Sequence, residues 1–417
     1  MMPNETAING IGQRADLTFK YNLASGRHGW LRLTPAYSVK IVEDILREYK
    51  KKLFVLDPFS GTATTTLCAA SRGHFALSVE INPFLVWLGQ AKLSQYSPED
   101  LVLAKESAQR MENLISSQQI APVPPPPISN IEKWWEPGDL LYLRQLRACL
   151  DDLKFDNNRA KNLLETAFCR TLIGLSRAAF NHQSLSFRTP GKIRLQEGFW
   201  SNKVLGKAVF KKELDFILNS ALPNPEGIGK VIKGDARAMD QSLDRDFDLL
   251  ISSPPYPNRI SYIRELRPYM YWLGYLKNSR QAGEMDWEAI GGTWGIATSR
   301  LSKWKRNSSA FSPLYLERII KAISESDTVS GSLLSKYIDK YFEDIWQHLV
   351  SAKKIMKPKS AINYIVGNSK FYDIVVPVEQ IYRDMLKEAG FKKVEVRILR
   401  KRNSKKELFE FQVSARL

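Results

Sequence analysis

The stretch Leu53-Phe-Val-Leu-Asp57-Pro-Phe-Ser-Gly61-Thr-Ala-Thr-Thr65 decides the fold of this chain. Its apolar beginning is typical of a short buried strand, and the turn that follows opens a helix through residues 67–70. Gly73 is placed to end that helix, and the apolar run 75–79 predicts a second strand that stops at Glu80. Strand, helix and strand in this order indicate a βαβ unit, and therefore an α/β protein built on a parallel sheet.

An acidic residue at the end of the second strand of such a unit is the arrangement that binds the ribose hydroxyls of adenosine. The pattern GxGxxG, which cradles a pyrophosphate, is absent from the turn. A small cofactor that carries adenosine without phosphate fits better, and S-adenosylmethionine is the obvious one. The alternative is an α/β domain with an ordinary glycine turn. The residues expected around the cofactor are Tyr37, Asp57, Phe59, Gly61, Thr62, Glu80, Ile81, Asn82, Asp235 and Ala236.

A second stretch, Asp248-Leu-Leu-Ile-Ser-Ser253-Pro254-Pro255-Tyr256, predicts another buried strand that ends in a stiff loop. Open α/β sheets bind their ligands at the carboxyl ends of strands. The loop offers a hydroxyl, outward carbonyls and a flat ring, so a planar group with an exocyclic amine could bind and stack there. The alternative is a Pro-Pro turn that merely closes a strand.

Composition narrows the class of protein. Lys and Arg number 61 against 44 Asp and Glu, which gives a formal charge of +17 over 417 residues and favours nucleic acid as the partner. A merely basic surface is the alternative.

With four histidines and no CxxC pattern, we expect no metal site. With no export signal and no long apolar run, we expect a cytoplasmic protein without membrane association. The cysteines are expected to be reduced, buried and apolar in role: Cys68, Cys149 and Cys169.

The sequence divides into three parts. Residues 15–92 form the first half of the cofactor-binding domain, and 229–417 form its catalytic half. Residues 93–228 predict a largely helical insert with a proline-rich linker at 122–127, which is a candidate for target recognition. Residues 276–335 read as polar loops that could contact nucleic acid. Strands are expected at 53–56, 75–79, 230–233, 249–251, 361–366, 391–399 and 408–415.

Polar and basic residues after a predicted helix are candidates for contact with bases or phosphates. Asn181, His182 and Arg188 form one such group, and Arg259 follows the proline loop. A hydrogen-bonded loop is the alternative for the first group.

These features together resemble a known family. The turn 57–65 followed later by Ser-Pro-Pro-Tyr is similar to the amino-methyltransferases of DNA, specifically the modification enzymes of restriction–modification systems. The segment 34–38 resembles the one that those enzymes place before the cofactor turn. The segments 181–187 and 367–369 resemble a subgroup of them. The resemblance covers roughly residues 15 to 417, and the pair of motifs is more specific than either motif alone.

The resemblance implies a Rossmann-like methyltransferase sheet of seven strands with a reversed final hairpin. It also implies S-adenosylmethionine as the methyl donor, double-stranded DNA as the substrate and a cognate restriction endonuclease nearby. One residue departs from the pattern, because Ala63 stands where the family usually has glycine. Alanine can open a helix there, so we expect a small change in cofactor fit.

The chemistry of an aromatic amine suggests a role for the proline loop. Hydrogen bonds from the amine to the Pro254 carbonyl and the Ser253 hydroxyl would return electron density to the nitrogen, which then attacks the methyl group. The target base must leave the duplex, and Tyr256 would stack on it, while Pro255 stiffens the loop. By resemblance, serine in the first motif position favours N4 of cytosine. The alternatives are N6 of adenine, an RNA- or protein-modifying methyltransferase, and a non-enzymatic nucleic-acid-binding protein.

Overall fold

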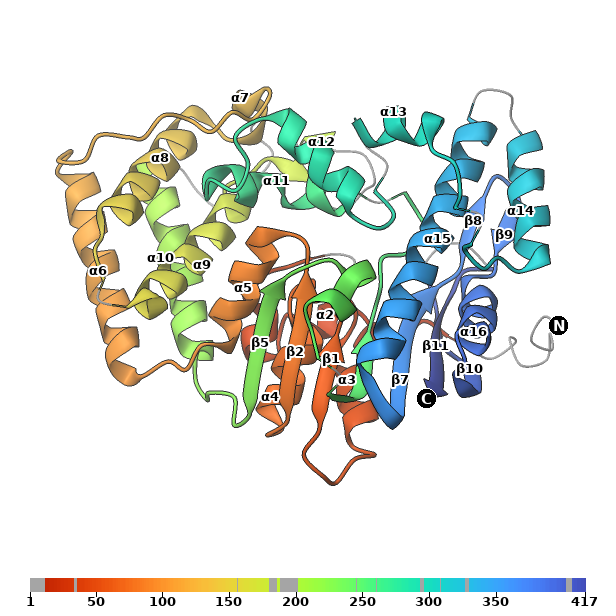
Figure 1. Cartoon of the computed structure of the whole chain (residues 1–417). Coiled ribbons are helices and arrows are strands. Elements are labelled where there is room, and N and C mark those ends of the chain that lie inside the picture. Colours follow the sequence, from red (N-terminus) through yellow and green to blue (C-terminus); the bar gives the residue numbers. More distant parts are fainter. Residues whose placement is uncertain are drawn as a thin grey trace.

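A seven-stranded sheet forms the centre of the molecule, with helices on both faces and a helical layer beside it (Figure 1). The structure is a computed structural model. It describes residues 12–33, 36–155, 157–179, 186–187, 202–244, 246–259, 261–292, 296–307, 309–326, 330–402 and 407–417.

The strand order is β10-β11-β7-β6-β1-β2-β5. The strands from β7 to β5 pair in parallel, whereas β11 is antiparallel to both β7 and β10. This is the Rossmann-like sheet with a reversed final hairpin that the sequence predicted, and each expected strand overlaps an observed one. The strands are β1 (Phe54–Asp57), β2 (Phe75–Glu80), β5 (Ile228–Lys233), β6 (Phe247–Ser252), β7 (Met356–Gly367), β10 (Lys392–Lys401) and β11 (Phe409–Arg416).

Both faces of the sheet are covered because successive strand residues point in opposite directions. Val55 and Leu249 share one core with α3 and α4, whereas Leu56 and Leu250 share another with α15 and α16. The runs of apolar residues in the central strands follow from this double burial. These helices span α3 (Val39–Leu46), α4 (Thr64–Ser71), α15 (Gly331–Ile355) and α16 (Val378–Glu388), and the 3-10 segment η3 (Ala236–Gln241) packs against α15.

The expected helical insert packs against the sheet domain through one continuous core. Met111, Leu146 and Phe168 of the insert lie in the same buried cluster as Phe84 and Tyr269, whose rings stack with centroids 5.2 Å apart. The helices of this layer are α5 (Pro83–Leu93), α6 (Pro98–Ser116), α7 (Ile131–Trp134), α8 (Pro137–Asp152), α9 (Asn158–Gly174), α10 (Asn202–Ser220) and α11 (Tyr262–Trp272).

The segment 276–335 differs from the expectation of polar loops. It contains α12 (Ser279–Glu288), α13 (Ile296–Lys303) and α14 (Leu314–Glu325). In α14, Leu316 and Ile323 are buried against α15, and the partly buried Tyr315, Ile319 and Ile320 pack against the same core, so the helix is strongly amphipathic. Shorter elements are η1 (Ala15–Leu17), α2 (Phe19–Asn22), η2 (Gly26–Trp30), β3 (Ala178–Ala179), β4 (Ser186–Phe187), β8 (Ser369–Phe371) and β9 (Ile374–Val376).

The three cysteines are buried and free, as their apolar role predicted. Within the described ranges, none of the helices is long and apolar enough to cross a membrane.

Candidate active site

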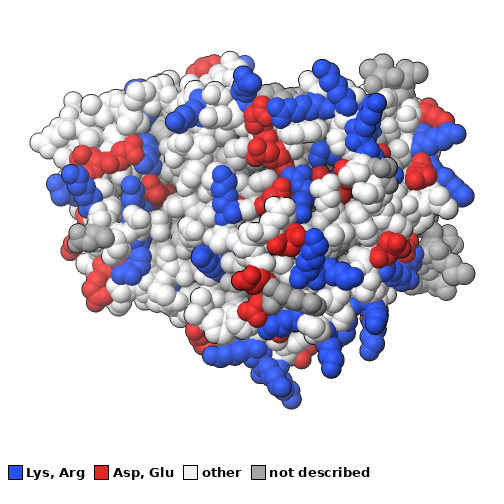
Figure 2. All heavy atoms as spheres, in the orientation of Figure 1, with Lys and Arg blue, Asp and Glu red and all other residues white. Residues whose placement is uncertain are grey.

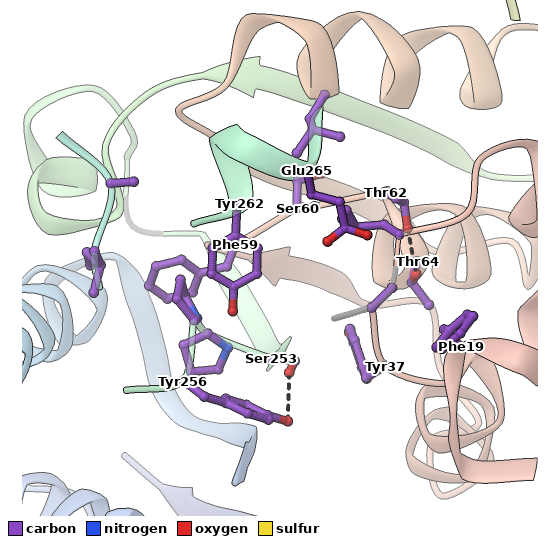
Figure 3. A pocket seen from close by; sticks show the side chains of 18 of the residues that line it. Phe19, Tyr37, Phe59, Ser60, Thr62, Thr64, Ser253, Tyr256, Tyr262 and Glu265 are labelled. Atoms are coloured by element: carbon purple, nitrogen blue, oxygen red, sulfur yellow. Dashed lines mark hydrogen bonds between the residues drawn. The ribbon is translucent and has the colours of Figure 1, made fainter. Parts of the chain in front are cut away.

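A cavity of about 760 Å³ lies where β1, β2 and β6 reach their carboxyl ends. The turn after β1 and the loop after β6 both line it, although they are nearly two hundred residues apart in the sequence. Figure 3 shows Tyr37, Thr62 and Thr64 on one side of this cavity, with Ser253 and Tyr256 across from them. The parallel pairing of β1 with β6 therefore brings together the two motifs that the sequence singled out.

The turn after β1 owes its shape to two residues with left-handed backbone. Gly61 has φ +50°, and an added Cβ there would meet nothing closer than the Phe59 carbonyl at 3.9 Å, so the glycine serves conformation rather than space. Ala63, the departure from the family pattern, has φ +60° and precedes α4 as its N-cap. It therefore does not open the helix in helical geometry, as the sequence suggested, but occupies a conformation that glycine adopts more cheaply.

Glu80 at the end of β2 holds this turn in place. One carboxylate oxygen accepts from the Gly61 N–H at 2.8 Å, and the other accepts from the Asn82 N–H at 2.9 Å. Asn82 in turn caps α5, because its side chain accepts from the Phe84 N–H. Burial raises the pKa of Glu80 to about 7. The carboxylate also faces the cavity, so it can accept from a ligand hydroxyl.

Asp57 lies beneath the turn instead of in the cavity wall, where the sequence had placed it beside a ligand. It is fully buried, and one oxygen accepts from the Phe59 N–H and from the Ser252 hydroxyl at 2.5 Å. Its other oxygen is buried with no hydrogen-bond partner among the described residues. Burial raises the pKa of Asp57 to about 6. Asp57 thus joins the end of β1 to the end of β6.

The third wall follows β5. Asp235 caps η3 through the Arg237 N–H, and the Arg237 guanidinium bridges Asp235 and Asp344. Burial alone would raise the pKa of Asp235, but the hydrogen bond and charge of Arg237 outweigh it and lower that pKa. The buried His348 ring lies 3.0 Å from the Ala236 carbonyl and packs edge-on against Phe59. Arg237 and His348 were not foreseen, because they come from outside either motif.

Nine of the ten residues that the sequence predicted around the cofactor line the cavity. All except Asp57 line it: Tyr37, Phe59, Gly61, Thr62, Glu80, Ile81, Asn82, Asp235 and Ala236. The Tyr37 hydroxyl bonds with the Thr65 hydroxyl at the start of α4. The structure adds Phe19 and Lys20 from the amino-terminal segment, which the sequence reading had left without a role.

The Ser253-Pro254-Pro255-Tyr256 loop lines the opposite wall. The Ser253 hydroxyl lies 3.3 Å from the Tyr256 hydroxyl. The Pro255 carbonyl accepts from the Tyr341 hydroxyl of α15 at 2.8 Å, and this hydrogen bond anchors the loop to α15. A Cβ on Gly367 would come within 3.0 Å of the Tyr256 ring, so the glycine at the end of β7 lets that ring pack flat.

Of the predicted nucleic-acid contacts, Arg259 lies in the wall of the cavity and is exposed. Its backbone has φ +59° and its N–H donates to the Tyr337 hydroxyl. Asn181, His182 and Arg188 lie outside the described residues.

Several wall residues come from segments that carried no motif. Tyr262 and Glu265 stand at the start of α11, and Arg400, Arg402 and Glu410 belong to the closing hairpin. The helix α11 is rich in aromatic residues and arginine, and its rings at Tyr269, Tyr271 and Trp272 are buried in the core. No sequence signal marked the hairpin residues. Among the described residues, no group of three or more His, Cys, Asp or Glu side chains is placed to hold a metal ion.

No family model matches the chain. Among solved structures, TrmN from Thermus thermophilus is 10% identical and superposes with a TM-score of 0.31, covering 96% of this chain and 52% of its own. The rRNA methyltransferase aviRa from Streptomyces viridochromogenes is 11% identical with a TM-score of 0.32, covering 95% of this chain and 92% of its own. Scores this low do not by themselves show a shared fold.

The curated relatives match over nearly the whole chain. The Type II methyltransferase M.BsoBI of Geobacillus stearothermophilus is 22% identical across 93% of this chain and 82% of its own length. M.AvaI of Nostoc sp. is 21% identical across 93% and 83%, and M.MvaI of Kocuria varians is 20% identical across 84% and 77%. At low identity but over most of its length, the chain is thus similar to Type II methyltransferases, the class that its paired motifs resemble.

Proposed function

We propose that this protein transfers a methyl group from S-adenosylmethionine to the exocyclic N4 amine of a cytosine that has left the DNA duplex. The proposal extends to a role in a restriction–modification system beside a cognate endonuclease. The observation that carries it is the single cavity in which the turn after β1 faces the Ser-Pro-Pro-Tyr loop. The Type II methyltransferases that match most of the chain support the same reaction class.

The wall after β1 and β2 fits S-adenosylmethionine. The volume of about 760 Å³ lies within the range of small-molecule pockets, roughly 300–1,000 Å³, and leaves room for a second planar group. Glu80 presents a carboxylate suited to ribose hydroxyls, and Asp235 with Ala236 stands near the predicted adenine end. The unpartnered oxygen of Asp57 adds negative potential behind the turn. When bound, S-adenosylmethionine supplies an electrophilic methyl group on a positively charged sulfur.

The proline loop would hold the target base. Ser253 and the Pro254 carbonyl accept from the amine, which returns electron density to a nitrogen whose lone pair is otherwise delocalised into the ring. Tyr256 stacks on the base, and Tyr341 keeps the loop rigid through the Pro255 carbonyl. Serine before the prolines is what favours cytosine over adenine, by resemblance alone. N6-adenine methylation is the second candidate, since the same loop geometry serves any exocyclic amine.

Nucleoside mass spectrometry tests the proposal. DNA containing many sequence contexts is incubated with the protein and isotopically labelled S-adenosylmethionine, then digested to nucleosides. We expect labelled N4-methylcytosine, and no label with the Ser253→Ala variant. Labelled N6-methyladenine would keep the class of enzyme but refute the assignment of the base. Label in RNA or protein, with none in DNA, would refute the proposed substrate.

A further inference from the structure

A buried carboxylate stands behind the proline loop and continues its hydrogen bonds. The Tyr256 hydroxyl, which lies 3.3 Å from the Ser253 hydroxyl, donates to Oε1 of Glu410 at 3.0 Å. Glu410 is 4% exposed and belongs to β11. Three residues from opposite ends of the catalytic half thus form one hydrogen-bonded chain. It runs from the serine expected to meet the target amine to a carboxylate in the closing hairpin.

Arg400 forms an ion pair with this carboxylate and holds it in one orientation. Its Nε donates to Oε2 of Glu410 at 2.7 Å, and its Nη2 donates to Oε1 at 3.2 Å. This two-pronged pairing is the strongest geometry available to a guanidinium and a carboxylate. Gly367 lies opposite Glu410 in the ladder between β7 and β11, and the Tyr256 ring packs on that glycine. The register of the hairpin therefore sets where the carboxylate meets the tyrosine.

The carboxylate gives the chain of hydroxyls a direction. An ionised carboxylate can only accept hydrogen bonds, so Tyr256 must donate its proton to Glu410. The oxygen of Tyr256 is then available to accept from the Ser253 O–H. With its own proton committed to Tyr256, Ser253 presents only lone pairs to the cavity. Burial and the negative charge of Glu410 raise the pKa of Tyr256 well above its ordinary value, which keeps the donating proton in place.

We propose that Glu410, acting through Tyr256, is a positioning residue that makes Ser253 an obligate acceptor and thereby selects an amine over a carbonyl at the target position. This inference rests on the proposed function. A base with an amine donates to Ser253, whereas a base with a carbonyl at the same place meets lone pair against lone pair. The selection distinguishes cytosine from uracil, or adenine from hypoxanthine, so it holds for either candidate base.

The test uses Glu410→Gln, which keeps the size of the side chain but adds an N–H donor that can reverse the direction of the chain. The full-length protein is used with a duplex that contains the methylation site mapped for the wild type. We expect the single-turnover rate of methyl transfer to fall by about 10- to 100-fold, as the loss of a hydrogen bond to a charged group implies. The affinity for S-adenosylmethionine should stay within about twofold.

A second measurement distinguishes an effect of Glu410 on the direction of the hydrogen bonds from a merely structural support of the loop. Dissociation constants are measured for a duplex with the target base and for one that carries the corresponding carbonyl base. The ratio compared is the constant of the carbonyl duplex divided by that of the target duplex. The wild-type ratio should exceed that of Glu410→Gln by about tenfold or more. Comparing ratios cancels the different costs of opening the two base pairs, because that cost is the same for both proteins. If Glu410 had a purely structural role, Glu410→Gln would weaken the binding of both duplexes equally.

Tyr256→Phe tests the same chain without disturbing the ion pair, and so guards against misfolding of Glu410→Gln. It keeps the ring but removes the middle hydroxyl, so its rate should fall as far as that of Glu410→Gln, and the double variant should fall no further. Glu407→Gln makes the same chemical change at an exposed position of the hairpin, where Glu407 pairs with Lys370, and should leave rate and ratio unchanged.

Three results would overturn the inference. These are a wild-type rate and ratio in Glu410→Gln, losses that multiply in the double variant, or an unchanged ratio despite a lower rate. If the wild-type protein transfers no methyl group to DNA, the proposed function fails, and the inference fails with it. If wild-type transfer is observed and the variants behave like it, only the inference fails.

Discussion

At the scale of single residues, Glu80 connects the sequence motif to a measurable property of the site. It is an acidic residue buried at the end of β2, and its two oxygens accept from the backbone N–H groups of Gly61 and Asn82. Its raised pKa, to about 7, means that it titrates in the physiological range. The neighbouring Asp57, with its pKa raised to about 6, is expected to be ionised before Glu80 as pH rises.

We expect the affinity for S-adenosylmethionine to increase as pH rises through about 7. The ionised form of Glu80 accepts more strongly from ribose hydroxyls, so cofactor binding favours loss of its proton. Calorimetric titration between about pH 6 and 8 measures the dependence, and buffers with different ionisation enthalpies count the released proton. Glu80→Gln should bind more weakly at high pH and lose this part of the pH dependence.

Lys92 is a second group near the cofactor turn that titrates in the pH range of that experiment. Its ammonium is buried and donates to the Thr62 carbonyl of the same turn at 2.9 Å, and burial lowers its pKa to about 7. If the pH dependence survives unchanged in Glu80→Gln, the titrating group is not Glu80, and its role at the ribose is refuted.

The same shift has the opposite sign for stability without cofactor. The folded pKa of Glu80 lies above its ordinary value of 4.5, so its contribution to stability is fully present below pH 4.5. That contribution is lost as pH rises through about 7. Cofactor affinity and the stability of the empty protein therefore change in opposite directions over this range.

At the scale of elements, α5 compensates for the departure at Ala63. Gly89 of this helix faces the methyl group of Ala63, and a Cβ on Gly89 would lie 3.3 Å from it and 2.6 Å from Cγ2 of Val231. The alanine on the turn and the glycine on the helix are thus a matched pair. The left-handed conformation of Ala63 costs roughly 1 kcal/mol relative to glycine, while the absence of a side chain at Gly89 lets α5 pack closely against β5.

Gly89→Ala should lower the free energy of unfolding by up to about 2 kcal/mol. Alanine is the better helix former by about 1 kcal/mol, but overpacking against Val231 costs typically 1–3 kcal/mol and outweighs that gain. Urea denaturation measures the change. On a Val231→Ala background, the same substitution should cost much less, because the methyl groups that it meets are gone. Equal cost on both backgrounds would show that the contact with Val231 is not the cause.

The elements also show which parts of the fold are readable from sequence. The strands of the sheet are short apolar runs or alternating apolar and polar runs, both of which are local patterns, so all seven were placed. The helices α12 and α13 were missed because few of their residues are apolar, whereas the helical spacing of Leu316, Ile320 and Ile323 in α14 was a readable signal that was overlooked. Glu410 could not be foreseen either, since its position depends on the register of β11 against β7. Contacts set by long-range pairing leave no trace in a local pattern.

At the scale of the whole molecule, the excess of basic residues is spread out. On the face in Figure 2, blue basic side chains are scattered among red acidic ones and do not gather into one patch. The formal charge of +17 nonetheless favours association with a polyanion over a broad area. Charge therefore supports the choice of nucleic acid but does not locate its path across the surface.

Affinity for a duplex that lacks the target site should fall by about tenfold or more when salt rises from about 50 to 200 mM. Each phosphate that a Lys or Arg neutralises releases a counterion, so the slope of log affinity against log salt counts the contacts. Fluorescence anisotropy with a labelled duplex measures it. Affinity for S-adenosylmethionine should change little over the same range. A flat response for the duplex would mean that the net charge is not used for nucleic acid.

The hydrogen bond between Asp57 and Ser252 joins the floor of the cofactor site to the strand that carries the proline loop. A cofactor that alters the ionisation or position of Asp57 must then alter the energy of the DNA-binding half. Thermodynamic linkage makes this reciprocal: whatever factor cofactor adds to DNA affinity, DNA adds to cofactor affinity. One short contact between two parallel strands would thus couple the two substrates, so that the affinity for each depends on whether the other is bound.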